Sequence, residues 1–114
     1  MTDCLFCKIA NKEIPSSAVY EDEKILAFKD INPEAPVHIL IIPKVHMDSV
    51  QDINQSNSSI ISHIFAIIPK LAKDLGVDEK GFRVVTNIGE HGDQTVKHLH
   101  FHMLGGRNLS WPPG

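Results

Sequence analysis

Residues 96–104 read Val-Lys-His-Leu-His-Phe-His-Met-Leu, so three of the seven histidines occupy alternate positions near the C-terminus. Successive side chains of a β-strand point to opposite faces, and this alternation therefore predicts a strand over 96–104 with the three imidazoles on one face. Leu99, Phe101 and Met103 take the other face and predict that the strand is buried. Such a strand indicates a proton-transferring, nucleophilic or metal-binding surface; the alternative is three singly hydrogen-bonded imidazoles without chemistry.

The rest of the chain predicts further strands and one main helix. Short runs rich in β-branched and aromatic residues predict the other strands, namely Ala18–Glu21, Ile25–Lys29, Val37–Pro43 and Phe82–Thr86. Ser56–Leu75 repeats apolar residues at helical spacing and is followed by Gly76, a residue typical of helix ends, while Pro69 predicts a kink or a break inside it. Cys4–Asn11 predicts a short helix and Asp48–Ile53 a helical turn. This order predicts an α+β fold whose antiparallel sheet is covered on one face.

Length and charge limit the class of protein. The 114 residues contain no repeat, linker or low-complexity stretch, which predicts a single domain over residues 1–114. The formal net charge of −3 argues against binding to nucleic acid or to an anionic membrane surface. No apolar run approaches the roughly 20 residues of a membrane span, and the N-terminus does not resemble a signal peptide. With only two cysteines, this pattern predicts a cytoplasmic protein in a reducing compartment.

A glycine-containing loop precedes the histidine stretch. Residues 87–97 read Asn-Ile-Gly-Glu-His-Gly-Asp-Gln-Thr-Val-Lys, which suits a loop whose backbone N–H groups converge on an anion. A plain glycine turn is the alternative on composition alone. Next to three histidines, the loop predicts the phosphate side of a phosphoryl or nucleotidyl site. His100 is then the expected nucleophile, because a neutral imidazole attacks phosphorus and an ordinary pKa of about 6.5 keeps it largely neutral.

Cys4 and Cys7 form a Cys-x-x-Cys pair at the spacing of zinc ligands. A tetrahedral structural site needs two further ligands, and His46 and His98 are the candidates. Such a site would be structural, because four protein ligands leave no position open for water. A metal-free buried thiol pair and a redox pair are the alternatives, and the redox interpretation lacks a thioredoxin-like βαβ context.

Four separated segments resemble one known family. His-Leu-His-Phe-His-Met-Leu over 98–104 matches the histidine triad motif His-φ-His-φ-His-φ-φ, in which φ is apolar, at every position. FCKIANKEIP (6–15), DINPEAPVHILIIPK (30–44) and LGGRNLSWPPG (104–114) are similar to the Hint branch of that superfamily, the histidine triad nucleotide-binding proteins. The resemblance covers nearly the whole chain. It implies a five-stranded antiparallel sheet with one main helix and a short N-terminal helix, paired into a homodimer in which the tail at 105–114 contacts the partner subunit.

The same resemblance implies a hydrolase that cleaves the P–N bond of adenosine or guanosine 5′-phosphoramidates through a nucleotidyl-histidine intermediate, without a metal in catalysis. By motif position, His100 is the nucleophile, His102 contacts the phosphate and handles the proton of the leaving amine, and His98 orients the cluster. His38 joins them from the neighbouring strand. The other residues that resemble the family's nucleotide contacts are Asp30, Ile31, Asn87, Gln94, Thr95 and Val96. Many bacterial members hold structural zinc with the positions that correspond to Cys4, Cys7, His46 and His98.

Two positions depart from the family pattern. Asp93 stands where this branch usually has glycine, which puts a carboxylate next to the anion site in a backbone that glycine adopts more freely. Thr95 replaces a frequent serine and keeps the hydroxyl. Asp93 therefore supports one alternative, a nucleotide-binding regulatory module with little turnover. The other alternative is a metallohydrolase in which His98, His100 and His38 hold a catalytic zinc.

Overall fold

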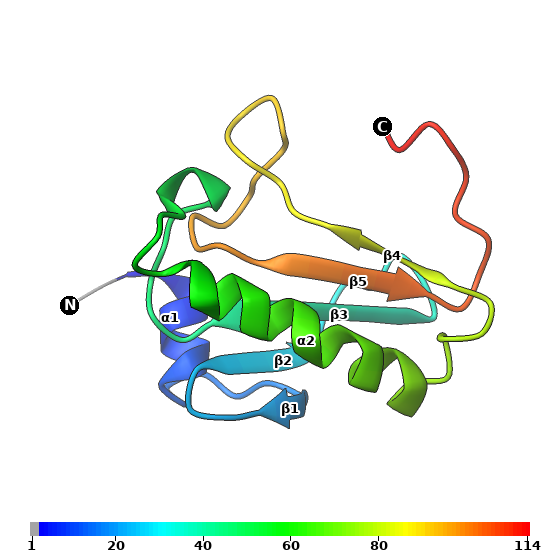
Figure 1. Cartoon of the computed structure of the whole chain (residues 1–114), viewed down its shortest axis with the longest axis horizontal. Coiled ribbons are helices and arrows are strands. Elements are labelled where there is room, and N and C mark those ends of the chain that lie inside the picture. Colours follow the sequence, from blue (N-terminus) through cyan, green and yellow to red (C-terminus); the bar gives the residue numbers. More distant parts are fainter. Residues whose placement is uncertain (1–2) are drawn as a thin grey trace.

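The computed structural model describes residues 3–114 and contains one five-stranded sheet in the order β1-β2-β3-β5-β4 (Figure 1). The strands are β1 Ala18–Glu21, β2 Ile25–Lys29, β3 Val37–Pro43, β4 Phe82–Val85 and β5 Phe101–Gly105. Every neighbouring pair is antiparallel. The predicted α+β fold is confirmed, and β1, β2 and β3 have the predicted bounds.

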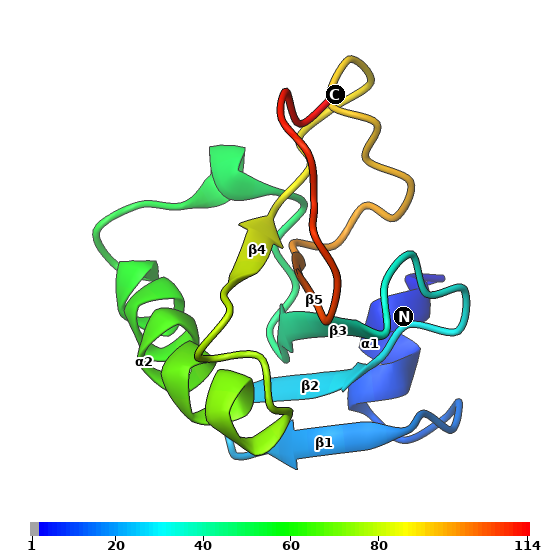
Figure 2. The same ribbon diagram turned by 90° about the vertical axis from the view of Figure 1, so that its right-hand side faces the viewer.

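The two faces of the sheet are covered by different helices, so the prediction of a sheet covered on one face is wrong (Figures 1 and 2). The helices are α1 Leu5–Ala10 and α2 Ser58–Asp74, and a 3₁₀ turn, η1, covers Val50–Asp52. Alternate residues of β3 divide between two buried clusters: Ile39 and Ile41 pack on the α2 side, whereas Leu40 and Ile42 pack on the α1 side with Phe6. Because α1 has 6 residues and α2 has 17, the α1 face is the less covered one, and the histidine site lies there.

Helix α2 runs through Pro69 without interruption, so the predicted break there is wrong. Pro69 is exposed, while Ile64, Ile68 and Leu71 on either side of it are buried against the sheet. Each buried side chain contributes about 1.5–3 kcal/mol, which together exceeds the roughly 3 kcal/mol that an internal proline costs. The helix ends at Asp74, one residue before the predicted Leu75. Gly76 follows with a φ of +76°, which allows its amide and the next one to bond back to the last turn.

Strand β5 begins at Phe101, so the prediction of a strand over 96–104 is wrong in its first half. In the register of the β3–β5 ladder Pro43 would face Leu99, but proline has no amide to donate. The Leu99 amide donates instead to the carbonyl oxygen of Met47 at 2.7 Å, in the loop after β3. Leu99 is nevertheless buried in the same cluster as Phe101, so the alternation of faces continues through the irregular segment.

The C-terminal tail leaves the end of β5 and extends away from the sheet (Figure 1). Arg83 of β4 holds its first part, because its guanidinium donates to the carbonyl oxygens of Leu109 at 3.1 Å and Ser110 at 2.8 Å. Trp111 keeps 79% of its surface exposed, so a single chain does not cover it. Among the helices of residues 3–114, none is long and apolar enough to cross a membrane.

Candidate histidine site and cysteine cluster

Three imidazoles meet on the α1 face of the sheet, and we call them the histidine cluster: His38, His100 and His102. His102 lies in β5, His38 lies in the neighbouring β3, and His100 lies just before β5. The ring centroids of His100 and His102 are 5.1 Å apart, and those of His38 and His102 are 5.2 Å apart. Phe6 of α1 packs edge-on against His100, with 5.0 Å between centroids. The fold therefore brings together three of the four predicted catalytic histidines.

His100 has an unprotonated Nε2, which we call bare. Its Nδ1 lies 2.7 Å from the carbonyl oxygen of His98, and a carbonyl only accepts, so the ring proton is on Nδ1. Burial lowers the pKa of His100, and this outweighs the opposing effects of the His98 carbonyl and the Asp30 carboxylate. His100 is therefore neutral at neutral pH, with the lone pair of Nε2 available for attack on an electrophile.

His102 has the opposite tautomer. The Glu34 amide donates to Nδ1 of His38 at 3.0 Å, so the proton of neutral His38 is on Nε2. That Nε2 lies 2.9 Å from Nδ1 of His102 and 3.4 Å from Oδ2 of Asp30. His102 accepts at Nδ1 and carries its own proton on Nε2. Burial and the neighbouring His100 and His38 lower the pKa of His102 to about 4, so this ring is also neutral.

The side chain of Gln94 holds the loop between β4 and β5 to its surroundings. Its Nε2 donates to the carbonyl oxygens of Asp48 at 2.6 Å and Val96 at 3.0 Å, and its Oε1 accepts from the Gly89 amide at 3.0 Å. All of these partners are backbone groups. Gln94, predicted as a nucleotide contact, therefore acts in this structure by shaping the loop and joining it to the segment after β3.

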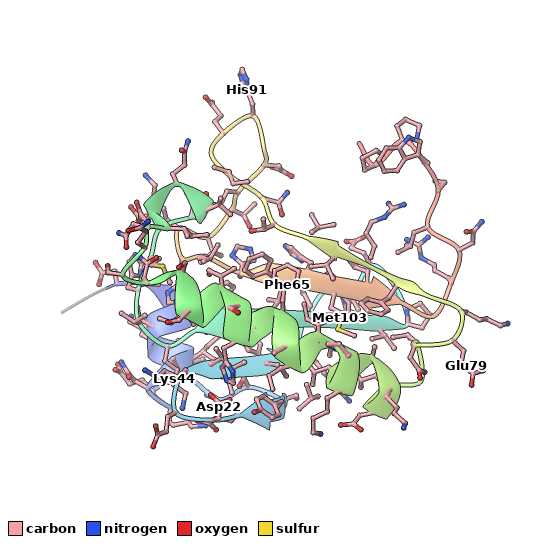
Figure 3. All side chains as sticks on the ribbon, in the orientation of Figure 1. Asp22, Lys44, Phe65, Glu79, His91 and Met103 are labelled. Atoms are coloured by element: carbon pink, nitrogen blue, oxygen red, sulfur yellow. The ribbon has the colours of Figure 1, made fainter. Side chains whose placement is uncertain are left out.

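The same loop is closed at its tip by Asn87, whose Nδ2 donates to the carbonyl oxygen of Gly92 at 2.6 Å. Figure 3 shows His91 at the outer tip, away from the sheet. Asp93 has a φ of +61°, the left-handed region in which a non-glycine residue is uncommon. This conformation agrees with the expectation that the backbone at this position favours glycine. Asp93 nevertheless adopts it.

The remaining predicted nucleotide contacts lie in two different places, one beside His38 and one beside Cys4. Asp30 follows β2, and its carboxylate reaches His38 and also accepts from the Asn32 amide at 2.8 Å. The adjacent Ile31 is 91% exposed, a large apolar side chain free to contact a ligand. Thr95 and Val96 lie toward the N-terminus of the chain, where they line a pocket of about 600 Å³ with other residues around Cys4.

A second group of side chains lies next to the histidine cluster. It consists of Cys4, Cys7, His46 and His98, whose ligand atoms all lie within 4.8 Å of one another, and we call it the cysteine cluster. Cys4 caps α1 and Cys7 lies in its first turn, so one helical turn places both sulfurs together. The Nδ1 of His98 is 3.3 Å from Sγ of Cys4 and 3.5 Å from Sγ of Cys7, and the Nδ1 of His46 is 3.3 Å from Sγ of Cys7.

Both histidines of the cysteine cluster are in the tautomer that a metal requires. Nε2 of His98 donates to the carbonyl oxygen of Pro43 at 2.8 Å, and Nε2 of His46 donates to Oδ1 of Asp48 at 2.7 Å. Each ring therefore turns a bare Nδ1 toward the sulfurs. Tetrahedral zinc, with bonds of about 2.3 Å to sulfur and 2.0–2.1 Å to nitrogen, separates such ligand atoms by about 3.5 Å. The donor set and its outer hydrogen bonds fit zinc.

The alternating stretch is thus divided between two sites. His98, predicted to orient the catalytic cluster and also to bind metal, has its ring in the cysteine cluster and contributes its carbonyl oxygen to His100. Several positioning groups were not predicted: Phe6, the carboxylate of Asp48, and the backbone groups of Glu34 and Pro43. Of these groups only the two side chains carry a sequence signal, Phe6 between the two cysteines and Asp48 two residues after His46, because backbone groups occur at every position.

The fold and the divided histidine stretch define a class: an α+β protein that presents two neutral imidazoles of opposite tautomer beside a glycine-containing loop. The comparisons with known proteins agree. Residues 3–110 match the family described as "Scavenger mRNA decapping enzyme C-term binding". Among solved structures, a HIT family hydrolase from Legionella pneumophila is 50% identical, with a TM-score of 0.96 and coverage of 98% of this chain and 100% of that chain.

A histidine triad protein from Clostridium difficile is 55% identical, with a TM-score of 0.93 and coverage of 96% of each chain. A relative from Zea mays with the name "14 kDa zinc-binding protein" is 49% identical over 112 residues, covering 96% of this chain and 87% of its own length. The chain belongs to the histidine triad (HIT) family.

Proposed function

We propose that this chain is a purine nucleotide-binding hydrolase of the Hint branch, which cleaves the P–N bond of adenosine or guanosine 5′-phosphoramidates. The observation that carries the proposal is the pair of opposite tautomers: a bare Nε2 on His100 beside an Nε2–H on His102. Nucleotidyl transfer to an imidazole needs both, one nitrogen to attack phosphorus and one proton near the leaving nitrogen. The names of the structural relatives, which include HIT family hydrolases, support the class of reaction.

The proposed reaction begins when the anionic phosphate binds, because its negative charge raises the pKa of His102 and that ring takes up a second proton at Nδ1. The Nε2–H of His38, which donates to that Nδ1 in the free protein, then turns to Oδ2 of Asp30, 3.4 Å away. Nε2 of His100 attacks phosphorus, the P–N bond to the amine breaks, and His102 gives its proton to the departing nitrogen. The intermediate is a nucleotidyl-imidazolium on His100. Water then attacks phosphorus, His102 removes the proton of that water, and His100 leaves as neutral imidazole. His102 is then protonated again, as it was in the substrate complex, and it releases this proton when the nucleotide leaves, so the cycle balances in protons and charge.

The other predicted contacts have proposed places around this reaction. Asp30 binds the ribose hydroxyls and Ile31 lies against the base, in keeping with a carboxylate beside the cluster and an exposed apolar side chain. Asn87, Thr95 and Val96 are proposed to contact the phosphate and ribose once a nucleotide is bound, and Gln94 to act through the loop backbone that it holds. His38 keeps the tautomer of His102.

The test is the hydrolysis of an adenosine 5′-phosphoramidate by the full chain, with wild type compared to His100→Gln and His102→Gln, each with and without a chelator. Hydrolysis that survives chelation and is lost in His100→Gln supports the proposal. Acid-quenched wild type should carry one covalent nucleotide, detected by mass spectrometry. Activity abolished on chelation of a folded protein, as opposed to a partial fall, indicates the metallohydrolase instead. Tight nucleotide binding without release of amine indicates the regulatory module.

We also propose that the cysteine cluster binds one structural zinc ion. Two sulfurs and two bare Nδ1 atoms support this, together with the zinc-binding names of plant relatives. The four residues would form a closed tetrahedral shell that fastens α1 to the loop after β3, and zinc would supply no chemistry to the reaction. Metal analysis of purified wild type should give one zinc per chain. An undiminished metal content in Cys4→Ala would overturn this assignment.

We further propose a cytoplasmic homodimer in which the tail covers part of the partner subunit. β4 is at the edge of the sheet, and Trp111 is exposed at the end of a tail that Arg83 holds in place. Light scattering should give twice the mass of the chain, and subcellular fractionation should recover the protein with cytoplasmic markers. A monomer at micromolar concentration would overturn the dimer.

A further inference from the structure

We propose that the cysteine cluster positions the nucleophile, so that occupation of the cluster by its metal controls the rate of the proposed reaction. This inference rests on the proposed function and adds regulation to the same site. Two hydrogen-bonded routes and one ring contact connect the two clusters, and none of them belongs to the strand ladder. Asp48 and Gln94 are the positioning residues through which the second route runs.

The first route passes through His98. Its ring lies in the cysteine cluster, and its carbonyl oxygen accepts the Nδ1 proton of His100 at 2.7 Å. Because β5 starts at Phe101, no ladder hydrogen bond fixes the peptide that carries this carbonyl. Two contacts outside the ladder hold it instead: the Leu99 amide of the same peptide donates to the Met47 carbonyl oxygen, and the His98 ring is held between the two sulfurs and the Pro43 carbonyl oxygen. Releasing the ring on the sulfur side loosens the group that determines which nitrogen of His100 is bare.

The second route passes through Asp48. Its carboxylate holds Nε2 of His46 at 2.7 Å, and its carbonyl oxygen accepts from Nε2 of Gln94 at 2.6 Å. Gln94 in turn accepts from the Gly89 amide, in the loop proposed to receive the phosphate. One residue thus contacts both a proposed metal ligand and the loop. A shift of His46 is therefore expected to reach the phosphate side through Asp48 and Gln94.

The ring contact passes through Phe6. This side chain packs edge-on against His98 at 5.9 Å and against His100 at 5.0 Å between centroids. Phe6 lies between Cys4 and Cys7 in sequence, so the ion that holds these two cysteines also holds Phe6. The body of the sheet does not depend on these contacts, because its larger core lies on the other face with α2. A metal-free protein is therefore expected to stay folded with a displaced His100.

The experiment uses the full chain with ¹⁵N-labelled histidine, in the zinc-loaded and zinc-stripped states. Long-range ¹H–¹⁵N spectra report which nitrogen of His100 carries the proton, independently of turnover. The loaded protein should show His100 protonated at Nδ1, and the stripped protein a mixture of tautomers. In parallel, kcat should fall about tenfold on stripping, in the range known for outer-shell losses at metal sites, while KM changes less than twofold. Re-addition of zinc should restore both readouts.

Variants along the second route, each assayed at a zinc concentration that keeps one ion per chain, make the test independent of folding. Asp48→Ala and Gln94→Ala should each lower kcat several-fold, whereas Asp48→Asn, which keeps an oxygen to accept from His46, should restore most of the rate. Gln55→Ala and Asp78→Asn, both at exposed positions away from either route, are the matched controls. A stripped, folded protein that keeps the Nδ1 proton on His100 overturns the inference. A different outcome is that neither the loaded nor the stripped protein hydrolyses the substrate, while the tautomer of His100 still changes when zinc is removed. The proposed function then fails, and the link between the cysteine cluster and His100 stands.

Discussion

The cysteine cluster and the histidine cluster draw on the same alternating stretch, yet they use its imidazoles in opposite ways. His98 is held through Nε2 by the carbonyl oxygen of Pro43 and presents Nδ1 to two sulfurs. His100 is held through Nδ1 by the carbonyl oxygen of His98 and presents Nε2. Both residues are histidines and both are buried. The backbone acceptor behind each ring selects the tautomer, and the tautomer decides between metal ligand and nucleophile.

The largest expected effect comes from removing the nucleophile alone. His100→Gln should lower hydrolysis of an adenosine 5′-phosphoramidate by at least about 10³-fold, because loss of a covalent nucleophile removes the whole two-step route. Its zinc content, measured by emission spectrometry, should equal that of wild type, since His98 and its partners are untouched. If His100→Gln loses zinc as well as activity, the cysteine cluster depends on the histidine cluster for metal binding.

The opposite change, loss of the metal site, should be seen mainly in stability. Cys4→Ala removes one of the four proposed ligands, and at free zinc 1,000 times the Kd the bound ion contributes about 4 kcal/mol to the free energy of unfolding. Urea unfolding of wild type with zinc should therefore occur at a clearly higher midpoint than that of Cys4→Ala. Wild type with chelator is the control and should match the variant. Equal midpoints with and without zinc would exclude a stabilising metal.

A smaller effect is the uptake of protons by His102 when a nucleotide binds, which does not involve the cysteine cluster. Its pKa is lowered to about 4 in the free protein, mainly by burial, and bound phosphate should raise it. Binding of AMP then takes up protons, so affinity should rise as the pH falls from 8 toward 5 and level off below about pH 4. Calorimetry in buffers of different ionisation enthalpy measures this uptake directly. His102→Gln should bind AMP without it, and unchanged uptake in that variant would assign the proton to another group.

The smallest effect concerns the loop that lies between the two regions. Asp93→Gly relieves a left-handed φ of +61° at a cost or gain within about 1 kcal/mol, because glycine also gains freedom in the unfolded chain. It also removes a negative charge beside the proposed phosphate site. We expect KM for the phosphoramidate to fall two- to fivefold with little change in kcat. Asp93→Asn removes the charge but keeps the side chain and separates the two causes.

Much of the fold could be predicted because its signals are local. Val37–Pro43 is apolar on both faces and flanked by proline, and it forms the strand with those bounds. The start of β5 could not be predicted, because it depends on a proline that faces Leu99 across the sheet and on the Met47 carbonyl. The predicted break at Pro69 was wrong for a similar reason, since burial of the residues around it outweighs its local cost.

The residues of the candidate site could be named from motifs, but their arrangement could not. The four side chains of the cysteine cluster were predicted from ligand spacing, and the structure brings them together. The tautomers follow from carbonyl and amide groups, such as those of Pro43 and Glu34, which carry no side-chain signal. Gln94 was expected at the nucleotide, and its three backbone partners became visible only with the loop in place.

The cysteine cluster joins residues that are far apart along the chain, and this has a consequence for the order of events during synthesis. Cys4 and His98 are separated by 94 positions, and Cys7 and His46 by 39. Three of the four donors leave the ribosome with the first half of the chain, and the fourth follows almost at the end. The cluster therefore closes only after β1 to β4 and helix α2 have been made. An ion bound by all four residues is therefore present only in chains that have been synthesised beyond β4, as far as His98.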